Sequence, residues 1–197
     1  MSPLELLEQN IAEKGLAIPA EEWQRLRADL SEITYAAGAV IFSIADVSYG
    51  WFFLSSGIAA SEQVSPDGET SIARFFETGQ FCANLTSTWR QELAPDNLVA
   101  ITDVEGVVLP DRIFRAEYLR GGVFGEFLRL KAMETLLFDK DLIIAKTSTD
   151  TEMRYRFLEQ SHAQVVARVP QKDIARFLGV TPQGLSRFLR RTGRRPT

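Results

Sequence analysis

The feature that most constrains the fold is a stretch near the C-terminus, residues 169–191, whose small and apolar residues follow the spacing of two crossed helices. Ala175 is small enough for close helix contact, and Gly179 tolerates the positive φ of a tight turn. Thr181 can cap the second helix, and Pro182 suits its first turn. The shared core is expected to contain Ile174, Leu178, Val180, Leu185 and Phe188. The stretch therefore predicts a helix-turn-helix.

The second helix of this pair is predicted to present a polar and basic face to solvent. Helices of this kind enter the major groove of DNA, where an arginine can pair with the two acceptors of guanine. The residues expected to contact DNA are Thr181, Gln183, Ser186, Arg187, Arg190 and Arg191.

Charge is distributed unevenly along the sequence. The whole chain has a net charge of −4, yet residues 150–197 contain ten basic and four acidic residues. This C-terminal segment therefore carries +6, and residues 1–149 carry −10. Because DNA attracts cations and repels anions, any contact with DNA is expected from the C-terminal segment. The alternative is an arginine-rich segment that is only solvated.

The first part of the chain is predicted to combine helices with an antiparallel, jelly-roll-like β-roll. Apolar residues at helical spacing predict helices over residues 3–14 and from 19 to about 31. From residue 34 to 110, short apolar runs alternate with glycine turns, which is typical of a roll or barrel. Ser65-Pro-Asp-Gly68 predicts a hairpin turn. The expected strands cover residues 40–42, 51–54, 58–60, 72–76, 98–101 and 107–109.

A long helix is predicted over residues 124–144, which are rich in Leu, Met, Lys and Glu and contain no proline. Its apolar stripe consists of Phe127, Leu130, Leu137 and Ile144. Glu134 and Asp141 interrupt the stripe, which therefore predicts an imperfect coiled-coil seam. A further helix is expected over about 150–162, capped by residues 147–149.

In this order, the elements resemble those of the Crp/Fnr family of bacterial transcription regulators from about residue 20 to residue 191. The segments that carry the resemblance are 35–42, 51–57, 76–81, 152–157 and, most specifically, 169–191. The resemblance implies a homodimer that pairs along the long helix, binds inverted repeats of double-stranded DNA and works with RNA polymerase. Arg187 matches a base-reading arginine of the family and Gln183 a polar base contact, whereas Pro182 replaces a basic residue of some relatives.

The resemblance also implies a domain organisation within an α+β fold. Residues 1–123 would form N-terminal helices and a cyclic-nucleotide-binding-like β-roll that acts as a sensor domain. Residues 124–149 would form the dimerisation helix and a hinge, and residues 150–197 the helix-turn-helix domain.

The effector motif of the family is degenerate in this sequence. In Phe81-Cys-Ala-Asn-Leu85, Ala83 and Asn84 replace a glycine and the glutamate that holds the ribose, and residues 94–99 lack the arginine that holds the phosphate. Arg90 is nearby in the sequence and could replace the missing arginine, although it does not match the motif. We therefore expect that cAMP and cGMP do not bind in the family manner, and that the pocket either holds another small molecule or is filled by side chains. The residues assigned to this pocket are Phe81, Cys82, Ala83, Asn84, Leu85 and Asn97.

One cysteine and one histidine limit the cofactor chemistry of the chain. Cys82 alone cannot hold an iron–sulfur cluster and is expected to be a buried structural thiol. His162 is expected at the surface or at a hinge, outside the roll, so the histidine-rich metal site of cupin-like barrels is not predicted. We therefore expect no cofactor, no metal and no enzymatic activity. The alternative is a cupin-like small-molecule-binding protein or enzyme without DNA binding.

No apolar run approaches the ~20 residues that span a membrane, and residues 1–5 lack the pattern of a signal peptide. No membrane partner is expected, and a cytoplasmic location is predicted. The tryptophans, Trp23, Trp51 and Trp89, are expected to lie in the core.

Overall fold

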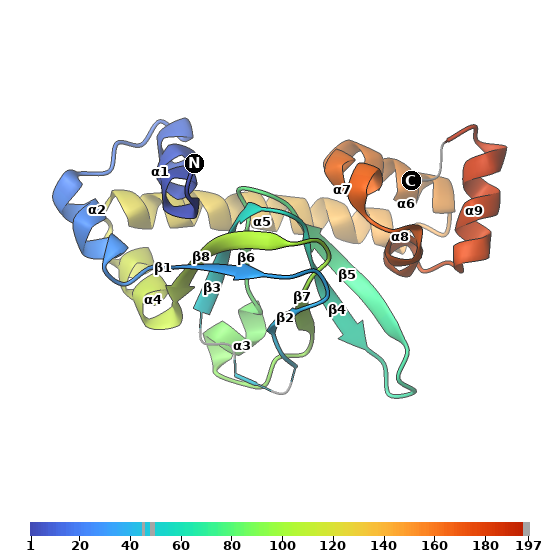
Figure 1. Ribbon diagram of the computed structural model, residues 1–197, viewed down its shortest axis with the longest axis horizontal. Helices are drawn as coiled ribbons and strands as arrows, with labels where there is room; N and C mark the ends of the chain where they lie inside the picture. Colours follow the sequence, from blue (N-terminus) through green and yellow to red (C-terminus); the bar gives the residue numbers. More distant parts are fainter. Residues whose placement is uncertain (45, 48–49, 195–197) are drawn as a thin grey trace.

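Two four-stranded antiparallel sheets form the centre of the molecule, with helices at both ends (Figure 1). The computed structural model describes residues 1–44, 46–47 and 50–194. In the first sheet the strands lie in the order β1 (Ser31–Tyr35), β8 (Val104–Pro110), β3 (Gly50–Ser56) and β6 (Phe81–Cys82). In the second sheet the order is β2 (Val40–Phe42), β7 (Asn97–Ala100), β4 (Ala59–Val64) and β5 (Thr70–Phe76). The predicted antiparallel roll is confirmed.

The helices precede, interrupt and follow the strands (Figure 1). Those of the N-terminal part are α1 (Pro3–Glu13), α2 (Ala20–Arg27), α3 (Leu85–Arg90) and α4 (Asp111–Arg120). The long α5 (Val123–Thr147) runs along the molecule from the N-terminal helices toward the C-terminal ones. The C-terminal helices are α6 (Thr151–Ser161), α7 (Ala163–Arg168), α8 (Gln171–Leu178) and α9 (Pro182–Arg191).

Local sequence signals explain several of these boundaries. The Ser2 hydroxyl accepts a hydrogen bond from the Glu5 amide, and the Glu5 carboxylate accepts one from the Ser2 amide, so a capping box begins α1. Gly68, with a φ of +85°, lies in the predicted hairpin turn between β4 and β5. The predicted extension of the second helix to about residue 31 is wrong, because residues 31–35 pair with β8 instead.

Two further features differ from the sequence expectations. The Asp150 side chain caps α6 by accepting a hydrogen bond from a first-turn amide at 2.9 Å, so residues 147–149 are not the cap. Trp23 is buried, but Trp89 is 51% exposed and does not lie in the core. The Trp89 ring is covered on one side by the Arg115 guanidinium, 4.9 Å from the ring centroid, rather than by apolar neighbours.

Strand β3 separates two cores of the N-terminal part. Consecutive residues of a strand point to opposite faces, and both Phe52 and Phe53 are fully buried. Phe52 lies in the core between the two sheets, whereas Phe53 lies in the core beneath α1, α2, α4 and the start of α5. Gly106 of β8 passes so close that a Cβ atom there would lie 2.3 Å from the Phe53 carbonyl oxygen. The pairing of these two strands therefore requires a residue without a side chain at position 106.

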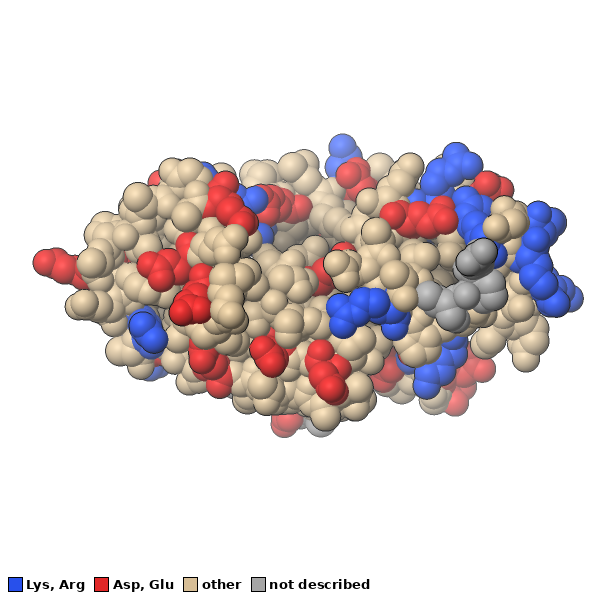
Figure 2. Space-filling view, turned by 45° about the horizontal axis from the view of Figure 1, so that its top comes forward, with Lys and Arg blue, Asp and Glu red and all other residues tan. Residues whose placement is uncertain are grey.

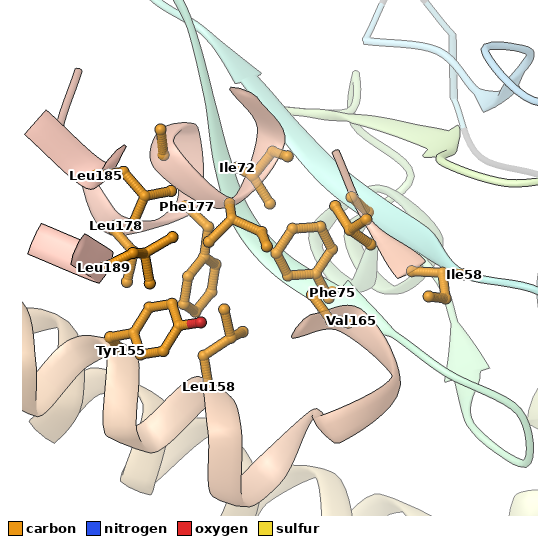
Figure 3. Close-up of a cluster of buried hydrophobic side chains, with 14 of the residues drawn as sticks. Ile58, Ile72, Phe75, Tyr155, Leu158, Val165, Phe177, Leu178, Leu185 and Leu189 are labelled. Atoms are coloured by element: carbon orange, nitrogen blue, oxygen red, sulfur yellow. The ribbon is translucent and has the colours of Figure 1, made fainter. Parts of the chain in front are cut away.

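A third core, which we call the junction core, joins the roll to the C-terminal helices (Figure 3). Figure 3 shows Ile72 and Phe75 of β5 directed toward side chains of the C-terminal helices. The ring centroids of Phe75 and Phe177 are 5.3 Å apart. The junction core consists of Ile58, Ala60, Ile72, Phe75, Leu142, Tyr155, Leu158, Val165, Val169, Ile174, Ala175, Phe177, Leu178, Leu185, Phe188 and Leu189.

Polar contacts accompany the junction core. Arg176 of α8 forms an ion pair with Glu62 of β4, and its Nε atom donates to the Thr70 carbonyl oxygen at 3.3 Å. Lys146, near the end of α5, donates from Nζ to the Ile72 carbonyl oxygen at 2.7 Å. Burial lowers the pKa of Lys146 to about 8. These contacts attach the β4–β5 hairpin to both α5 and α8.

Because the junction core is shared, we expect Leu178→Ala to destabilise the roll together with the C-terminal helices. Leu178 is fully buried, and its truncation should lower the free energy of unfolding by about 2–5 kcal/mol. All three tryptophans lie outside the C-terminal helices, so tryptophan fluorescence reports unfolding of the N-terminal part alone. The urea midpoint of unfolding should decrease, and the midpoint from fluorescence should coincide with that from circular dichroism.

The matched control is Leu119→Ala, since Leu119 of α4 is exposed. This change should alter the free energy of unfolding by no more than about 0.5 kcal/mol. A fluorescence midpoint that stays unchanged in folded Leu178→Ala protein would contradict a shared core.

Candidate functional site

Helices α8 and α9 form a pair that follows the sequence prediction. α8 ends at Gly179, which has a φ of +65°, and Ala175 is fully buried. The Thr181 hydroxyl caps α9 by accepting a hydrogen bond from the Gly184 amide at 3.0 Å, and Pro182 occupies the first turn. These contacts fix the start of α9 and therefore which of its side chains face outward.

The outer face of α9, which we call the α9 face, brings together all six residues predicted to contact DNA. The exposed members are Thr181, Gln183, Arg187, Arg190 and Arg191. Ser186 is half-buried, between Gln183 and Arg190 along the edge of a shallow hollow. The apolar side of the same helix, with Leu185 and Phe188, is buried in the junction core.

The cations of the α9 face are not neutralised by carboxylates among the described residues. Two other arginines of the C-terminal region are paired: Arg176 with Glu62, and Arg194 with Glu159 at 2.9 Å. No ion pair of this kind involves the three arginines of the α9 face within the described part of the chain. Figure 2 shows many of the Lys and Arg side chains gathered at this end of the molecule, whereas Asp and Glu are spread over the whole face. The α9 face is therefore suited to a polyanion.

A cavity of about 160 Å³, which we call the roll cavity, lies between the roll and α5. Its walls are mainly aromatic and aliphatic, with charged groups at Arg74, Lys131 and Asp139. The lining residues are Trp51, Arg74, Phe76, Phe81, Ala83, Leu85, Phe114, Leu128, Lys131, Ala132, Thr135 and Asp139. The side chains of the roll thus leave room for a small molecule.

The roll cavity includes half of the residues that the sequence assigns to the effector pocket, namely Phe81, Ala83 and Leu85. The assignment of the other three residues to this cavity is wrong. Cys82 points to the opposite face of β6, into the core between the sheets. Asn84 caps α3 by accepting a hydrogen bond from the Ser87 amide at 3.0 Å, and Asn97 accepts one from the Ile44 amide at 2.7 Å. Local structural roles therefore occupy both amide side chains.

The charged residues of the roll cavity carry little signal in the sequence. Arg74 lies within the apolar run 72–76, and the available signal is a charged residue inside an otherwise apolar strand. Lys131 and Asp139 lie on α5, where helical spacing alone does not show which face meets the roll. Arg90, the candidate for a replacement arginine, is exposed at the end of α3 and does not line the cavity.

Arg74 connects β5 to α5 at the wall of the roll cavity. Its Nη1 atom lies 2.6 Å from Oδ1 of Asp139, and its guanidinium lies over the rings of Phe76 and Phe138, 4.7 and 4.6 Å from their centroids. Burial lowers the pKa of Arg74 and raises the pKa of Asp139, although each charge favours ionisation of the other. Burial also lowers the pKa of Lys131. The cavity wall therefore holds charges that are poorly solvated.

His162 is buried where α6 meets α7, so the surface position allowed by the sequence is wrong. Its Nδ1 atom lies 2.8 Å from Oε2 of Glu77. Its ring meets the rings of Phe75 and Phe138 edge-on, with centroids 6.5 and 5.1 Å apart. His162 thus belongs to the contact between the roll, α5 and the C-terminal helices.

Cys82 is fully buried between the sheets, as expected for a structural thiol. Burial raises the pKa of this thiol, which suppresses the reactive thiolate. We therefore expect iodoacetamide to leave the native protein unmodified at mildly alkaline pH and to modify it fully in guanidinium chloride, as measured by intact mass. Modification of the native protein at the denatured rate would show that Cys82 is accessible.

Residues 32–120 match the sequence model of the family described as "Cyclic nucleotide-binding domain". No curated protein matches the sequence. The structure of FixK2 from Bradyrhizobium japonicum is 16% identical, covers 83% of this chain and 86% of its own, and has a TM-score of 0.66. A CooA mutant from Carboxydothermus hydrogenoformans is 17% identical over 98% of this chain and 84% of its own, with a TM-score of 0.69. CLP, a c-di-GMP responsive global regulator of Xanthomonas campestris, is 14% identical, covers 89% of this chain and 92% of its own, and has a TM-score of 0.63.

Residues 32–120 therefore resemble a cyclic nucleotide-binding domain, and the fold of the chain is that of the FixK2, CooA and CLP structures. The resemblance inferred from the sequence is therefore confirmed for the fold. No catalytic family is indicated by the matches. None of the described helices combines the length and the apolar character needed to cross a membrane.

Proposed function

We propose that the chain is a homodimeric transcription regulator of the Crp/Fnr type that binds inverted-repeat DNA through the α9 face. The observation that carries the proposal is a capped helix whose exposed arginines have no carboxylate partner among the described residues. A helix of this kind fits the major groove, and two copies related by a two-fold axis fit two half-sites. Contact with RNA polymerase, which the resemblance implies, is part of the proposal.

Within the α9 face, Arg187 is the residue proposed to read a base. It is exposed and lines the hollows on both sides of the helix. Its guanidinium can donate two hydrogen bonds to O6 and N7 of guanine. Gln183, one turn earlier, is positioned for a second base contact, while Arg190 and Arg191 in the last turn supply cations for phosphates.

Helix α5 offers the surface proposed to pair with a second copy of the chain. Phe127 is fully buried against the N-terminal helices, so its place in the predicted stripe is wrong. Farther along the helix, large apolar side chains are exposed at Leu130, Met133, Leu136, Leu137, Ile143 and Ile144. Among them, Leu130, Met133, Leu137 and Ile144 are separated by three, four and seven residues, which is the spacing of a helix-pairing seam. Pairing of α5 with α5 about a two-fold axis would bury this face.

We further propose that this domain does not bind cAMP or cGMP in the family manner. Asn84 stands in the position of the ribose-binding glutamate and is occupied as the cap of α3. No arginine lies in residues 94–99 to hold a cyclic phosphate. The volume of the roll cavity is about 160 Å³. Sites for drug-sized ligands usually have volumes of about 300 Å³ or more, so the roll cavity is smaller than these.

Arg187→Ala tests the DNA-reading role. It should weaken binding to the preferred inverted repeat, obtained by selection from random DNA, by about 1–3 kcal/mol, because two hydrogen bonds to guanine are lost. The preference for this site over random DNA should shrink as well. Fluorescence polarization measures both quantities.

Arg27→Ala is the matched control, since Arg27 is exposed on α2 at the other end of the molecule. It should leave DNA affinity unchanged. An equal loss on every sequence would assign Arg187 to phosphate contact, and no loss on any sequence would exclude the α9 face as the DNA surface.

Leu137→Lys tests the seam. Leu137 is 55% exposed in the single chain, and a lysine there would place a charge inside the paired helices. Dimerisation should weaken by about 3 kcal/mol or more. Light scattering after gel filtration should show a dimer for the wild type and for Leu119→Lys on α4, and a monomer for Leu137→Lys. A dimer that persists in Leu137→Lys would exclude this face.

A further inference from the structure

The size of the roll cavity limits what it can hold. An apolar cavity of about 150 Å³ holds one benzene molecule, and the roll cavity measures about 160 Å³. A cyclic nucleotide, with its base, ribose and phosphate, is larger than this space. The dimensions therefore fit a ligand with a single ring.

Four aromatic side chains contribute to the cavity wall. Trp51 and Phe114 stack with their ring centroids 3.8 Å apart and their planes within 7°. Phe76 of β5 and Phe81 of β6 contribute further rings, and Ala132 of α5 adds a small apolar group. Such walls favour a flat apolar ring over a sugar or a peptide.

One end of the cavity is polar. A hollow of about 60 Å³ shares four of its lining residues with the roll cavity: Arg74, Phe81, Lys131 and Thr135. The roll cavity itself is lined by two cations and one carboxylate, Asp139. Glu134 lies 3.2 Å from Lys131 but also pairs with Lys14. The wall of the roll cavity therefore carries an excess of positive charge.

Two of the lining residues each have a buried donor atom, Nε1 of Trp51 and Nε of Arg74, without a hydrogen-bond partner among the described residues. Leaving a buried donor unpaired is unfavourable. Because Arg74 and Lys131 both line the cavity and both are cationic donors, the complementary ligand group is an anionic acceptor. A carboxylate offers two acceptor oxygens and the negative charge that Arg74 and Lys131 call for.

We propose that the roll cavity binds a single-ring aromatic carboxylate, with the ring among the aromatic side chains and the carboxylate toward Arg74 and Lys131. The inference rests on the proposed function in that this ligand is the effector of the regulator. The ligand carboxylate competes with Asp139 for Arg74. Binding therefore weakens the contact between β5 and α5.

Benzoate is the probe, measured by calorimetry on the full chain. It should bind at least about tenfold more tightly than benzamide, which keeps the ring without the charge, and than acetate, which keeps the charge without the ring. cAMP should show no binding. Equal affinity for benzamide, binding of cAMP, or no benzoate binding at millimolar concentration would each overturn the proposal.

Variants locate the site. Ala132→Leu fills space in the cavity from an exposed position of α5 and should weaken benzoate binding about tenfold or more. The control, Ala12→Leu, makes the same change on α1, away from the cavity, and should leave benzoate affinity unchanged. Arg74→Gln should remove the preference for benzoate over benzamide. Ala83→Leu fills the cavity from the roll side and serves if circular dichroism shows Ala132→Leu to be unfolded. Unchanged benzoate affinity in a folded filling variant would overturn the proposal.

DNA binding is measured separately, so the two proposals fail separately. Benzoate binding without DNA binding would overturn the regulator and retain the ligand class. DNA binding without benzoate binding would overturn the ligand class and retain the regulator.

Discussion

Apolar packing of strand β5 against the C-terminal helices determines how the whole molecule is arranged. Phe75 and Phe177 meet across this contact, and Leu142 brings α5 into the same core. Burial of apolar surface is the main favourable term in folding, so a core shared by three parts of the chain favours their forming together. The direction of the α9 face is consequently set by the roll as well as by the C-terminal helices.

Helix α5 has different partners on its different faces. Its start packs with Phe124 and Phe127 against the N-terminal helices, and Lys131 and Asp139 border the roll cavity. Leu137 and the other exposed apolar residues of this helix face solvent in the single chain. This division of faces explains why the hydrophobic pattern of α5 is broad and why the sequence suggested only an imperfect seam.

The sequence was most informative where a residue type has one local use. Gly179, Thr181 and Pro182 specify a turn and a helix start through backbone conformation and capping, and the structure confirms the α8–α9 pair. The glycine-punctuated apolar runs likewise predicted the roll. Such signals act over a few residues, so they can be recognised without knowing the fold.

The cavity was less predictable because it depends on contacts between distant segments. Arg74 and Asp139 are 65 residues apart, and neither has a local signature that names the other. Within Phe81–Leu85, three residues line the roll cavity, but strand alternation turns Cys82 away from it. The Asn84 side chain instead caps α3, a helix that was not predicted from the sequence. His162 could be placed only once Glu77 and the rings around it were known.

Because α5 is a single uninterrupted helix, a movement of α5 at the roll cavity also displaces the end of the helix. The helix has 25 residues, about 37 Å, and Arg74 contacts it at Asp139, about two thirds of the way along. A small tilt at that point becomes a larger displacement at the tip, and in the proposed twofold pair the gap between the two reading helices changes by twice that amount. Since neighbouring base pairs are about 3.4 Å apart, a shift of less than 2 Å per subunit would change the spacing between the two reading helices by one base-pair step.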